Sequence, residues 1–189
     1  MKLLLLSVAI FCNLMVAAVN AQKPVVRKGG EFCEGYLLRE VAREQVGASR
    51  IVKLKAFNTA DETLPPELKE WLRTSIHTDM LAAFRLRHKK NNALIIRGTV
   101  AGATGIAANF TNWYVQPGAR PVMFRSLTEN PQLIFWDKGG LLNYYFVTYT
   151  DDFAVDRDWG NVTFDLRRYR VGSNGKAQLV SEERNVKCE

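Results

Sequence analysis

The chain has 189 residues, a formal net charge of +7 and three cysteines. This length suits one domain with a proper core and is too short for two typical ones, and the lack of an internal repeat of about 20–50 residues excludes a solenoid or a propeller. A basic chain is drawn to acidic partners such as glycans, anionic lipid surfaces and acidic proteins.

The first 21 residues have the three-part pattern of a secretory signal peptide. Met1 and Lys2 form a short positive start, residues 3–18 are almost entirely apolar, and Ala21 ends a small-residue cleavage motif. A membrane anchor is the alternative, but the apolar run is shorter than the roughly 20 residues that a span needs. We therefore expect residues 1–21 to be removed, the mature protein to be secreted and extracellular, and no transmembrane segment to remain.

Cysteine usage agrees with export. Cys12 lies in the expected signal peptide, which leaves Cys33 and Cys188 near the two ends of the mature chain. Such a pair in an oxidising compartment usually forms a disulfide, and no zinc-like spacing favours two free thiols instead. The triplets that begin at Asn109 and Asn161 match the N-glycosylation sequon, a motif that also arises by chance, and predict glycans at these two positions.

The first part of the mature chain mixes helical and extended patterns. Residues 22–32 are polar and contain a glycine pair, so we expect a flexible N-terminal arm. Good helix formers between apolar residues favour a short helix over 34–45, with a strand as the alternative. Residues 50–57 alternate in polarity and predict a strand, whereas residues 66–74 have apolar residues at helical spacing after a capping threonine and two prolines.

From residue 80 onward the pattern changes to period two. Segments 80–88 and 93–100 flank a polar link and predict a hairpin, with Phe84 and Leu86 on one face and arginines on the other. More strands are expected over 106–115, 122–127, 133–136, 141–149, 162–171 and from 178 onward, with a short strand at 153–155 as an option. About eight strands separated by turns predict a mainly β fold, either an antiparallel barrel or a sandwich, with one or two short helices.

Two segments resemble conserved parts of the lipocalin family. YYFVTYTDDFAV, residues 144–155, is similar to the family's strand–turn–strand segment. FDLRRYRV, residues 164–171, is similar to the late strand that carries the family's arginine, with Arg167 or Arg168 as the match. The chain departs from the family because it lacks Gly-x-Trp near residues 50–57 and has no clear helix after the last strand.

The resemblance covers the chain between the two cysteines and implies a fold and a function. The fold is an antiparallel eight-stranded lipocalin-like barrel with one or two short helices, a single domain over residues 33–189. The function is to bind a small hydrophobic molecule within the barrel, without catalysis. An unrelated β-rich secreted fold is the alternative.

The residue patterns of common catalytic and metal sites are absent. His77 and His88 are the only histidines, and neither has a second ligand at metal spacing. The sequence has no Gly-x-Ser-x-Gly elbow, and the acidic residues between 151 and 158 lack the spacing of a calcium loop. We therefore expect no enzyme activity, no metal and no cofactor.

Aromatic residues are concentrated in the expected strands, where alternation sends roughly half of them inward. Their default role is to fill the core, but inside an eight-stranded barrel the same residues line a cavity for one small apolar ligand. The candidate ligand-binding residues come from five strands: Phe84, Trp113, Phe135, Tyr145 and Phe164.

Two functions compete. The leading hypothesis is a secreted protein that carries or sequesters a small hydrophobic ligand inside a β-barrel. The alternative is a secreted interaction module that binds an acidic protein or an anionic glycan, with no nucleic-acid partner. It requires the basic hairpin residues 85–90 to lie beside Arg167, Arg168 and Arg170. A solvated basic face without a partner is the simpler explanation of these charges.

Overall fold

The structure is a computed structural model that describes residues 23–47, 50–54, 64–75, 82–99, 108–116, 122–150 and 162–189. The expected signal peptide, His77, Asn161 and the optional strand at 153–155 lie outside these ranges. The described elements are β1 Val25–Arg27, α1 Glu34–Glu44, β2 Arg50–Lys53, α2 Pro66–Ser75, β3 Ala82–His88, β4 Asn91–Thr99, β5 Thr111–Gln116, β6 Val122–Ser126, β7 Ile134–Trp136, β8 Leu142–Tyr149, β9 Phe164–Val171 and β10 Ala177–Cys188. Helices predicted over 34–45 and 66–74 are confirmed as α1 and α2.

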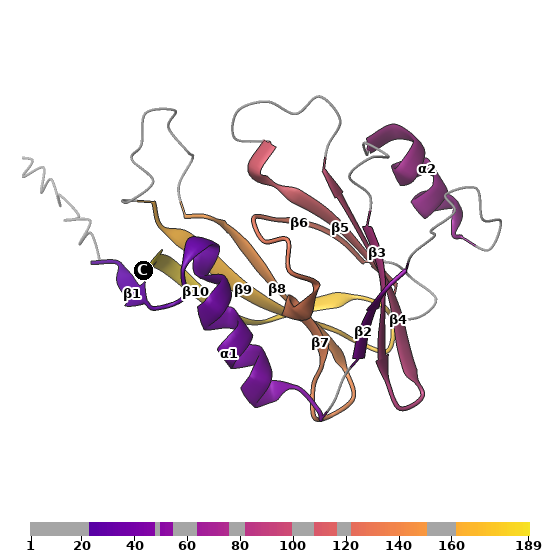
Figure 1. Cartoon of the computed structure of the whole chain (residues 1–189), viewed down its shortest axis with the longest axis horizontal. Helices are drawn as coiled ribbons and strands as arrows, with labels where there is room; N and C mark the ends of the chain where they lie inside the picture. The colour runs from indigo at the N-terminus through magenta and orange to yellow at the C-terminus, as the bar shows by residue number, and fades with distance from the viewer. Residues whose placement is uncertain are drawn as a thin grey trace, which may run out of the picture.

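The strands form two five-stranded sheets (Figure 1). The first sheet has the order β2-β3-β4-β5-β6 and is antiparallel throughout. The second sheet has the order β1-β10-β9-β8-β7 and is mixed, because β1 runs parallel to β10. Each sheet is built mostly from strands that are neighbours in the sequence, as expected for hairpin connections.

The expected antiparallel eight-stranded lipocalin-like barrel is wrong. Within the described residues the strands form two separate ladders, and no closed barrel results. At one seam the end of β6 touches β8 only locally, where Leu127 N–H donates to the carbonyl of Val147 at 2.9 Å. At the other seam the chain after α1 occupies the edge of β7, because Val46 N–H donates to the carbonyl of Trp136 at 3.0 Å. The chain after α1, and not β2, therefore lies beside β7, and the two sheets are not joined at this seam.

Helices cover the outer faces of the two sheets, and α1 and α2 lie on opposite sides of the molecule (Figure 1). The space between the sheets holds a central core, whose buried members include Phe84, Leu86, Ile95, Trp113, Val115, Ile134, Trp136, Leu142 and Tyr144. A second core lies between α1 and the second sheet, and a third lies between α2 and the first sheet. The chain therefore forms four layers, helix on sheet on sheet on helix.

Alternation along the strands decides which core each side chain enters. In β3, Phe84 and Leu86 belong to the central core, as predicted, whereas Ala83 packs beneath α2. In β8, Tyr144 faces the central core and Tyr145 faces α1. Because successive side chains of a strand point to opposite faces, each sheet contributes to two cores at once.

A disulfide between Cys33 and Cys188 joins the start of α1 to the end of β10. Their Cα atoms lie 5.1 Å apart, inside the normal range for a disulfide, so the predicted pairing is confirmed. Leu37 and Val41, one turn apart on α1, are both buried against the second sheet. The disulfide thus fixes the N-terminal end of α1, close to the contact of Leu37 with the second sheet.

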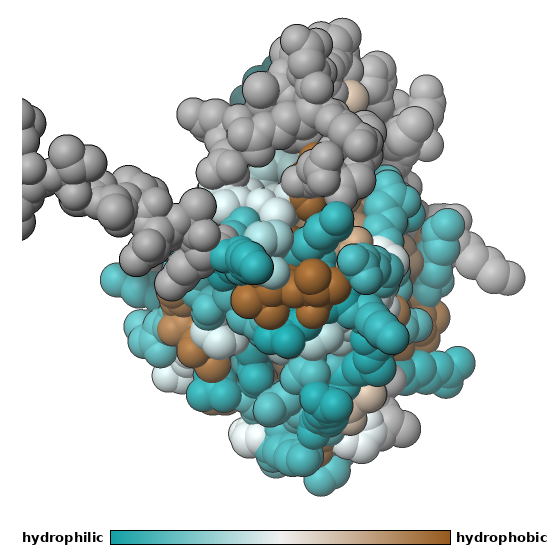
Figure 2. Space-filling view, turned by 90° about the vertical axis from the view of Figure 1, so that its left-hand side faces the viewer, coloured by the Kyte–Doolittle hydropathy of each residue, from teal (hydrophilic) through white to brown (hydrophobic). Residues whose placement is uncertain are grey.

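The segment expected as a flexible arm contributes a strand. Val25–Arg27 forms β1 and pairs with the last residues of β10, on the side of the molecule that Figure 2 shows as largely hydrophilic with small hydrophobic patches. Gly29 and Gly35 pack against each other, and a Cβ on Gly35 would lie 2.8 Å from the Gly29 carbonyl oxygen. This close approach anchors the arm on the first turn of α1.

Candidate functional site

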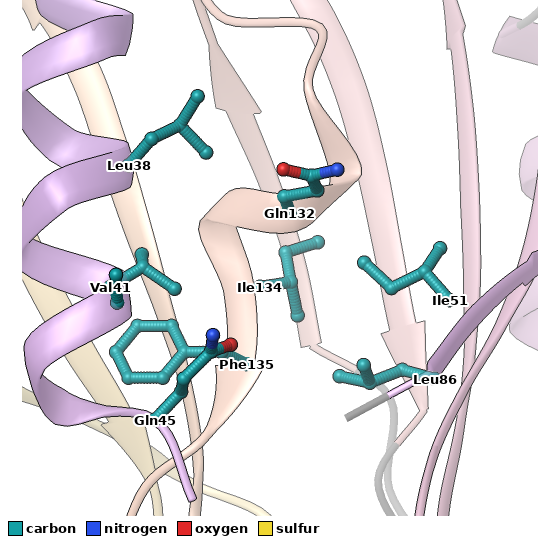
Figure 3. A pocket seen from close by; sticks show the side chains of 9 residues that line it. Leu38, Val41, Gln45, Ile51, Leu86, Gln132, Ile134 and Phe135 are labelled. Carbon is teal, nitrogen blue, oxygen red and sulfur yellow. The ribbon is translucent and has the colours of Figure 1, made fainter. Parts of the chain in front are cut away.

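A pocket of about 360 Å³ opens at the second of the two seams, between α1, β7 and the β2–β3 pair (Figure 3). Its walls come from parts of the chain that are far apart in sequence. The lining residues are Leu38, Val41, Ala42, Gln45, Ile51, Leu86, Gln132, Ile134 and Phe135.

One wall is a stripe along α1. Leu38, Val41 and Ala42 follow the spacing i, i+3 and i+4, which places them on one face of α1, and Gln45 follows directly after the end of the helix. Val41 is buried, while Ala42 is exposed and lies at the rim. This face of α1 therefore contacts the second sheet at Val41, and the pocket lies next to that contact.

The opposite wall is a cross-strand pair. Ile51 of β2 and Leu86 of β3 stand directly opposite each other in the antiparallel register. Leu86 is 1% exposed and belongs to the central core, whereas Ile51 is partly buried and packs against that core. The pair forms a rigid apolar surface, since both backbones are hydrogen-bonded in the sheet.

The floor is the short edge strand β7 and the turn before it. Ile134 belongs to the central core and Phe135 to the core beneath α1, so the pocket bends around the edge of the second sheet. Gln132 lies in the 3-10 turn Pro131–Leu133 that leads into β7, with Asn130 capping this turn through a 2.9 Å bond from Gln132 N–H to its Oδ1. The cap holds the turn that brings the Gln132 side chain to the pocket.

Most of the lining residues have apolar side chains, but polar atoms make up the larger part of the surface that the pocket exposes. Seven of the nine lining residues are aliphatic or aromatic, and the other two are Gln45 and Gln132. Apolar side chains together with placed polar groups are typical of a small-molecule site. The described lining contains no acid, base, thiol or hydroxyl side chain, so these residues suit binding and offer no nucleophile or general base.

A buried polar network supports the floor from the side of β8 and β9. Arg168 Nε donates to Asn143 Oδ1 at 3.1 Å, and its guanidinium carbon lies 5.4 Å from the Phe135 ring centroid. Asn143 Nδ2 in turn donates to Asp137 Oδ2 at 2.9 Å. Arg168 also approaches Glu44 of α1 at 3.5 Å, so the network links the helix to the sheet behind the pocket.

Asp137 is held as a carboxylate within this network. Burial alone would raise the pKa of Asp137, but hydrogen bonds from Leu141 N–H and from Asn143, together with the charge of Arg170, outweigh that effect. The pKa of Asp137 is therefore below its ordinary value. The Arg170 Nε atom lies 3.1 Å from Asp137 Oδ2.

The five candidate ligand-binding residues are divided between two cores. Phe84 and Trp113 lie in the central core, whereas Phe135, Tyr145 and Phe164 lie beneath α1. Of the five, Phe135 lines the pocket, and Tyr145 stacks on Phe135 with ring centroids 6.1 Å apart. Burial raises the pKa of Tyr145 to about 12 and keeps this residue neutral at physiological pH.

Sequence reasoning missed most of the pocket. A helix over 34–45 was predicted with a strand as the alternative, and Ile51 and Leu86 were expected on the apolar faces of their strands. Nothing in their spacing places these segments side by side, and Gln45 and Gln132 carry no motif. Which strands stay unpaired at the seam is decided by tertiary contacts, so the signal for the pocket was weak.

The basic residues fall into two separate groups. Arg167, Arg168 and Arg170 lie on β9 of the second sheet and form ion pairs, for example Arg167 Nε with Glu182 Oε1 at 2.6 Å. The hairpin formed by β3 and β4 belongs to the first sheet. The two groups are not on neighbouring strands, so the condition that the alternative hypothesis set for a combined basic patch is not met.

Neither a metal site, nor a membrane-spanning helix, nor a relative assigns a function to the described part of the chain. Within the described ranges, no three His, Cys, Asp or Glu residues cluster closely enough to hold a metal ion. None of the helices in those ranges has the length and apolar character to cross a membrane. No protein-family model, curated protein or solved structure matches the chain. The lipocalin resemblance therefore stays a prediction.

Proposed function

We propose that this protein binds a small hydrophobic molecule in the pocket between α1, β7 and the β2–β3 pair. The pocket itself is the observation that supports the proposal, because its size of about 360 Å³ falls in the range of ligand sites, which hold about 300–1,000 Å³. The site lies at the open seam between the sheets and replaces the barrel interior that the sequence led us to expect.

Binding would come mainly from apolar burial, which contributes about 25 cal/mol for each Å² removed from water. Ile51, Leu86 and Phe135 supply rigid surface on two sides, so little ordering is required when the ligand enters. The amides of Gln45 and Gln132 lie at the wall and would orient a hydroxyl or carbonyl group of the ligand (Figure 3). The role we propose is to carry or sequester such a molecule outside the cell, without a chemical step.

The test uses the full chain after removal of bound lipid. N-phenyl-1-naphthylamine, an uncharged fluorescent probe of apolar sites, is titrated into wild type and into Ala42→Trp. Ala42 is exposed at the rim on α1, so the larger side chain can block the pocket without entering the core. We expect saturable binding to wild type and a loss of at least about tenfold in affinity in the variant, the equivalent of about 1.4 kcal/mol.

Ala177→Trp is the matched control, because Ala177 is also exposed but lies at the start of β10, outside the pocket. It adds the same indole to the surface and should leave the affinity unchanged. Failure of wild type to bind the probe or any of a panel of alcohols, ketones and fatty acids would overturn the proposal. Equal affinity in wild type and Ala42→Trp would also overturn it.

A further inference from the structure

We propose a second binding surface, separate from the pocket, that takes a sulfated polysaccharide. It consists of Arg50 of β2 and Arg85 and Arg87 of β3, which we call the arginine face. Its existence depends on the pairing of β2 with β3, a contact that the sequence does not show.

The register of the two strands brings these three arginines together. Arg50 stands directly opposite Arg87, and Val52 stands opposite Arg85. Residues in directly opposite positions have Cβ atoms about 4.5–5.5 Å apart, and alternate residues of one strand lie about 7 Å apart. The three side chains therefore leave one face of the sheet from a small area.

The arginine face points away from the pocket. Ile51 and Leu86 alternate with the arginines and line the pocket on the inner side of the same two strands. Since successive side chains point to opposite faces, the arginines project from the outer side. Arg50 and Arg87 are exposed, and Arg85 is partly buried. Two sites on two faces of one strand pair are thus available to two different ligands.

Among the described residues, no carboxylate forms an ion pair with an arginine of this face. In the described part of the chain, none of the three forms an ion pair, whereas Arg27, Arg167 and Arg170 each contact a carboxylate. Like charges at directly opposite positions of a sheet destabilise it. The Arg50–Arg87 pair therefore works against folding by itself, and a bound anion would offset its repulsion.

The positive charge continues onto the hairpin tip beyond β3. Lys89 and Lys90 form the two-residue link to β4 and are both exposed. Asn92 of β4, also exposed, stands opposite Arg87 and adds a neutral hydrogen-bond donor. The result is a row of cations along β3 from Arg85 to Lys90, which suits a linear polyanion better than a single small ion.

The chemistry of the arginine face favours sulfate groups on a glycan. Guanidinium groups bind the oxygens of planar or tetrahedral anions through two parallel hydrogen bonds. Surfaces that bind single-stranded nucleic acid add exposed aromatic residues on which bases stack, and the aromatic residue of β2 to β4, Phe84, is buried on the other face. Membrane-binding surfaces add exposed apolar residues, and these described strands have none that is large. The Cys33–Cys188 disulfide is compatible with an oxidising compartment, where such glycans are found.

The experiment titrates a heparin-derived octasaccharide into the full, disulfide-bonded chain by calorimetry at several salt concentrations. Wild type is compared with the double variant Arg50→Ser and Arg87→Ser. We expect the variant to lose at least about tenfold in affinity. Its binding should also depend less on salt: the slope of the logarithm of the association constant against the logarithm of the salt concentration should become less steep by about one for each anion contact removed. The desulfated octasaccharide should bind wild type as weakly as the sulfated one binds the variant.

The matched control is Lys23→Ser with Lys28→Ser, which removes the same charge from two exposed positions beside β1 of the second sheet, away from the arginine face. It should bind the sulfated octasaccharide within about twofold of wild type. Equal loss in the control and in the arginine variant would overturn the proposal, since it would show attraction by net charge alone. A single-stranded DNA of equal charge that binds wild type as tightly, with the same loss in the variant, would also overturn it.

Binding of N-phenyl-1-naphthylamine separates this surface from the pocket. The double variant should keep wild-type probe affinity, because Ile51 and Leu86 on the inner face are unchanged. Retained probe binding also reports that the variant is folded. Loss of both ligands together would contradict two independent sites.

Discussion

The guanidinium group of Arg168 lies over the ring of Phe135, with its central carbon 5.4 Å from the ring centroid. Phe135 lines the floor of the pocket, so Arg168 helps to fix this floor from behind. Arg168 is itself 7% exposed and is held by Asn143 and Glu44. This contact connects the stability of the polar network to the shape of the pocket.

Arg168→Leu should therefore weaken both folding and binding. Removing one member of a buried charged network leaves Asn143 without its donor, and such changes lower the free energy of unfolding by about 2–4 kcal/mol. We also expect the affinity for N-phenyl-1-naphthylamine to fall, because Phe135 loses its packing partner. Urea unfolding and probe titration measure the two effects. Arg184→Leu is the control, since Arg184 is largely exposed and its ion pair with Glu182 should contribute less than about 1 kcal/mol. An equal loss in the free energy of unfolding in the two variants would show that the burial of Arg168 does not increase its contribution to stability.

Asp137 should make stability depend on pH in the acid range. Its pKa is lowered in the folded state, so the carboxylate stabilises the fold above the pKa of an unfolded aspartate, about 4, and this contribution disappears as the pH falls through the folded value. Asp137→Asn should be less stable than wild type at pH 7, and the difference should narrow below about pH 4. Urea unfolding at a series of pH values tests this. Glu129→Gln serves as the exposed comparison and should change little at pH 7. If the difference in the free energy of unfolding between wild type and Asp137→Asn stayed constant down to pH 2, the lowered pKa of Asp137 would be contradicted.

The disulfide should be a major source of stability. It closes a loop with a sequence separation of 155 residues, for which the chain-entropy model gives about 5 kcal/mol. Cys33→Ser with Cys188→Ser should lower the free energy of unfolding by an amount of this order, measured in urea. Probe affinity should fall as well, because α1 begins next to Cys33 and forms a wall of the pocket. Reduced wild type should behave like the double variant, and a change below about 1 kcal/mol in both would contradict the model.

Arg50→Ser should leave stability unchanged or raise it slightly. The substitution removes a like charge directly opposite Arg87, a relief of up to about 1 kcal/mol that added salt should diminish. Thermal unfolding at low and high salt measures this effect. Arg27→Ser is the contrast, because Arg27 donates to Glu183 from two nitrogen atoms and its loss should destabilise slightly. A marked loss of stability in Arg50→Ser would mean that Arg50 has a structural role, which conflicts with the arginine face.

Local structure was largely predictable from local patterns. Helix formers between apolar residues favoured α1 over a strand, and helical spacing with start signals predicted α2. Period-two alternation predicted the β3–β4 hairpin, with Phe84 and Leu86 on one face. The disulfide followed from the even pair of cysteines. These features depend on neighbours in the sequence or on composition, so they can be inferred without knowing the fold.

The barrel was wrong because strand spacing is the same in a closed barrel and in two open sheets. The two folds differ in which segments pair with a few edge strands, above all with β7. At this edge the carbonyl of Trp136 accepts a hydrogen bond from Val46 N–H. The parallel strand β1 was also missed, because three residues of an apparently loose arm have no alternating pattern to detect. Both features depend on contacts across more than 80 residues of sequence.

Taken alone, the sequence determined a mainly β chain with two short helices, one disulfide and alternating strand faces, because each of these arises from near neighbours or from residue type. Only the tertiary structure decided that the sheets stay apart, that the chain after α1 lies at the seam beside a pocket, and that Arg50 stands opposite Arg87. The physical reason is that edge pairing and register are settled by competition among distant segments, and a difference of one residue in register moves every side chain to the opposite face.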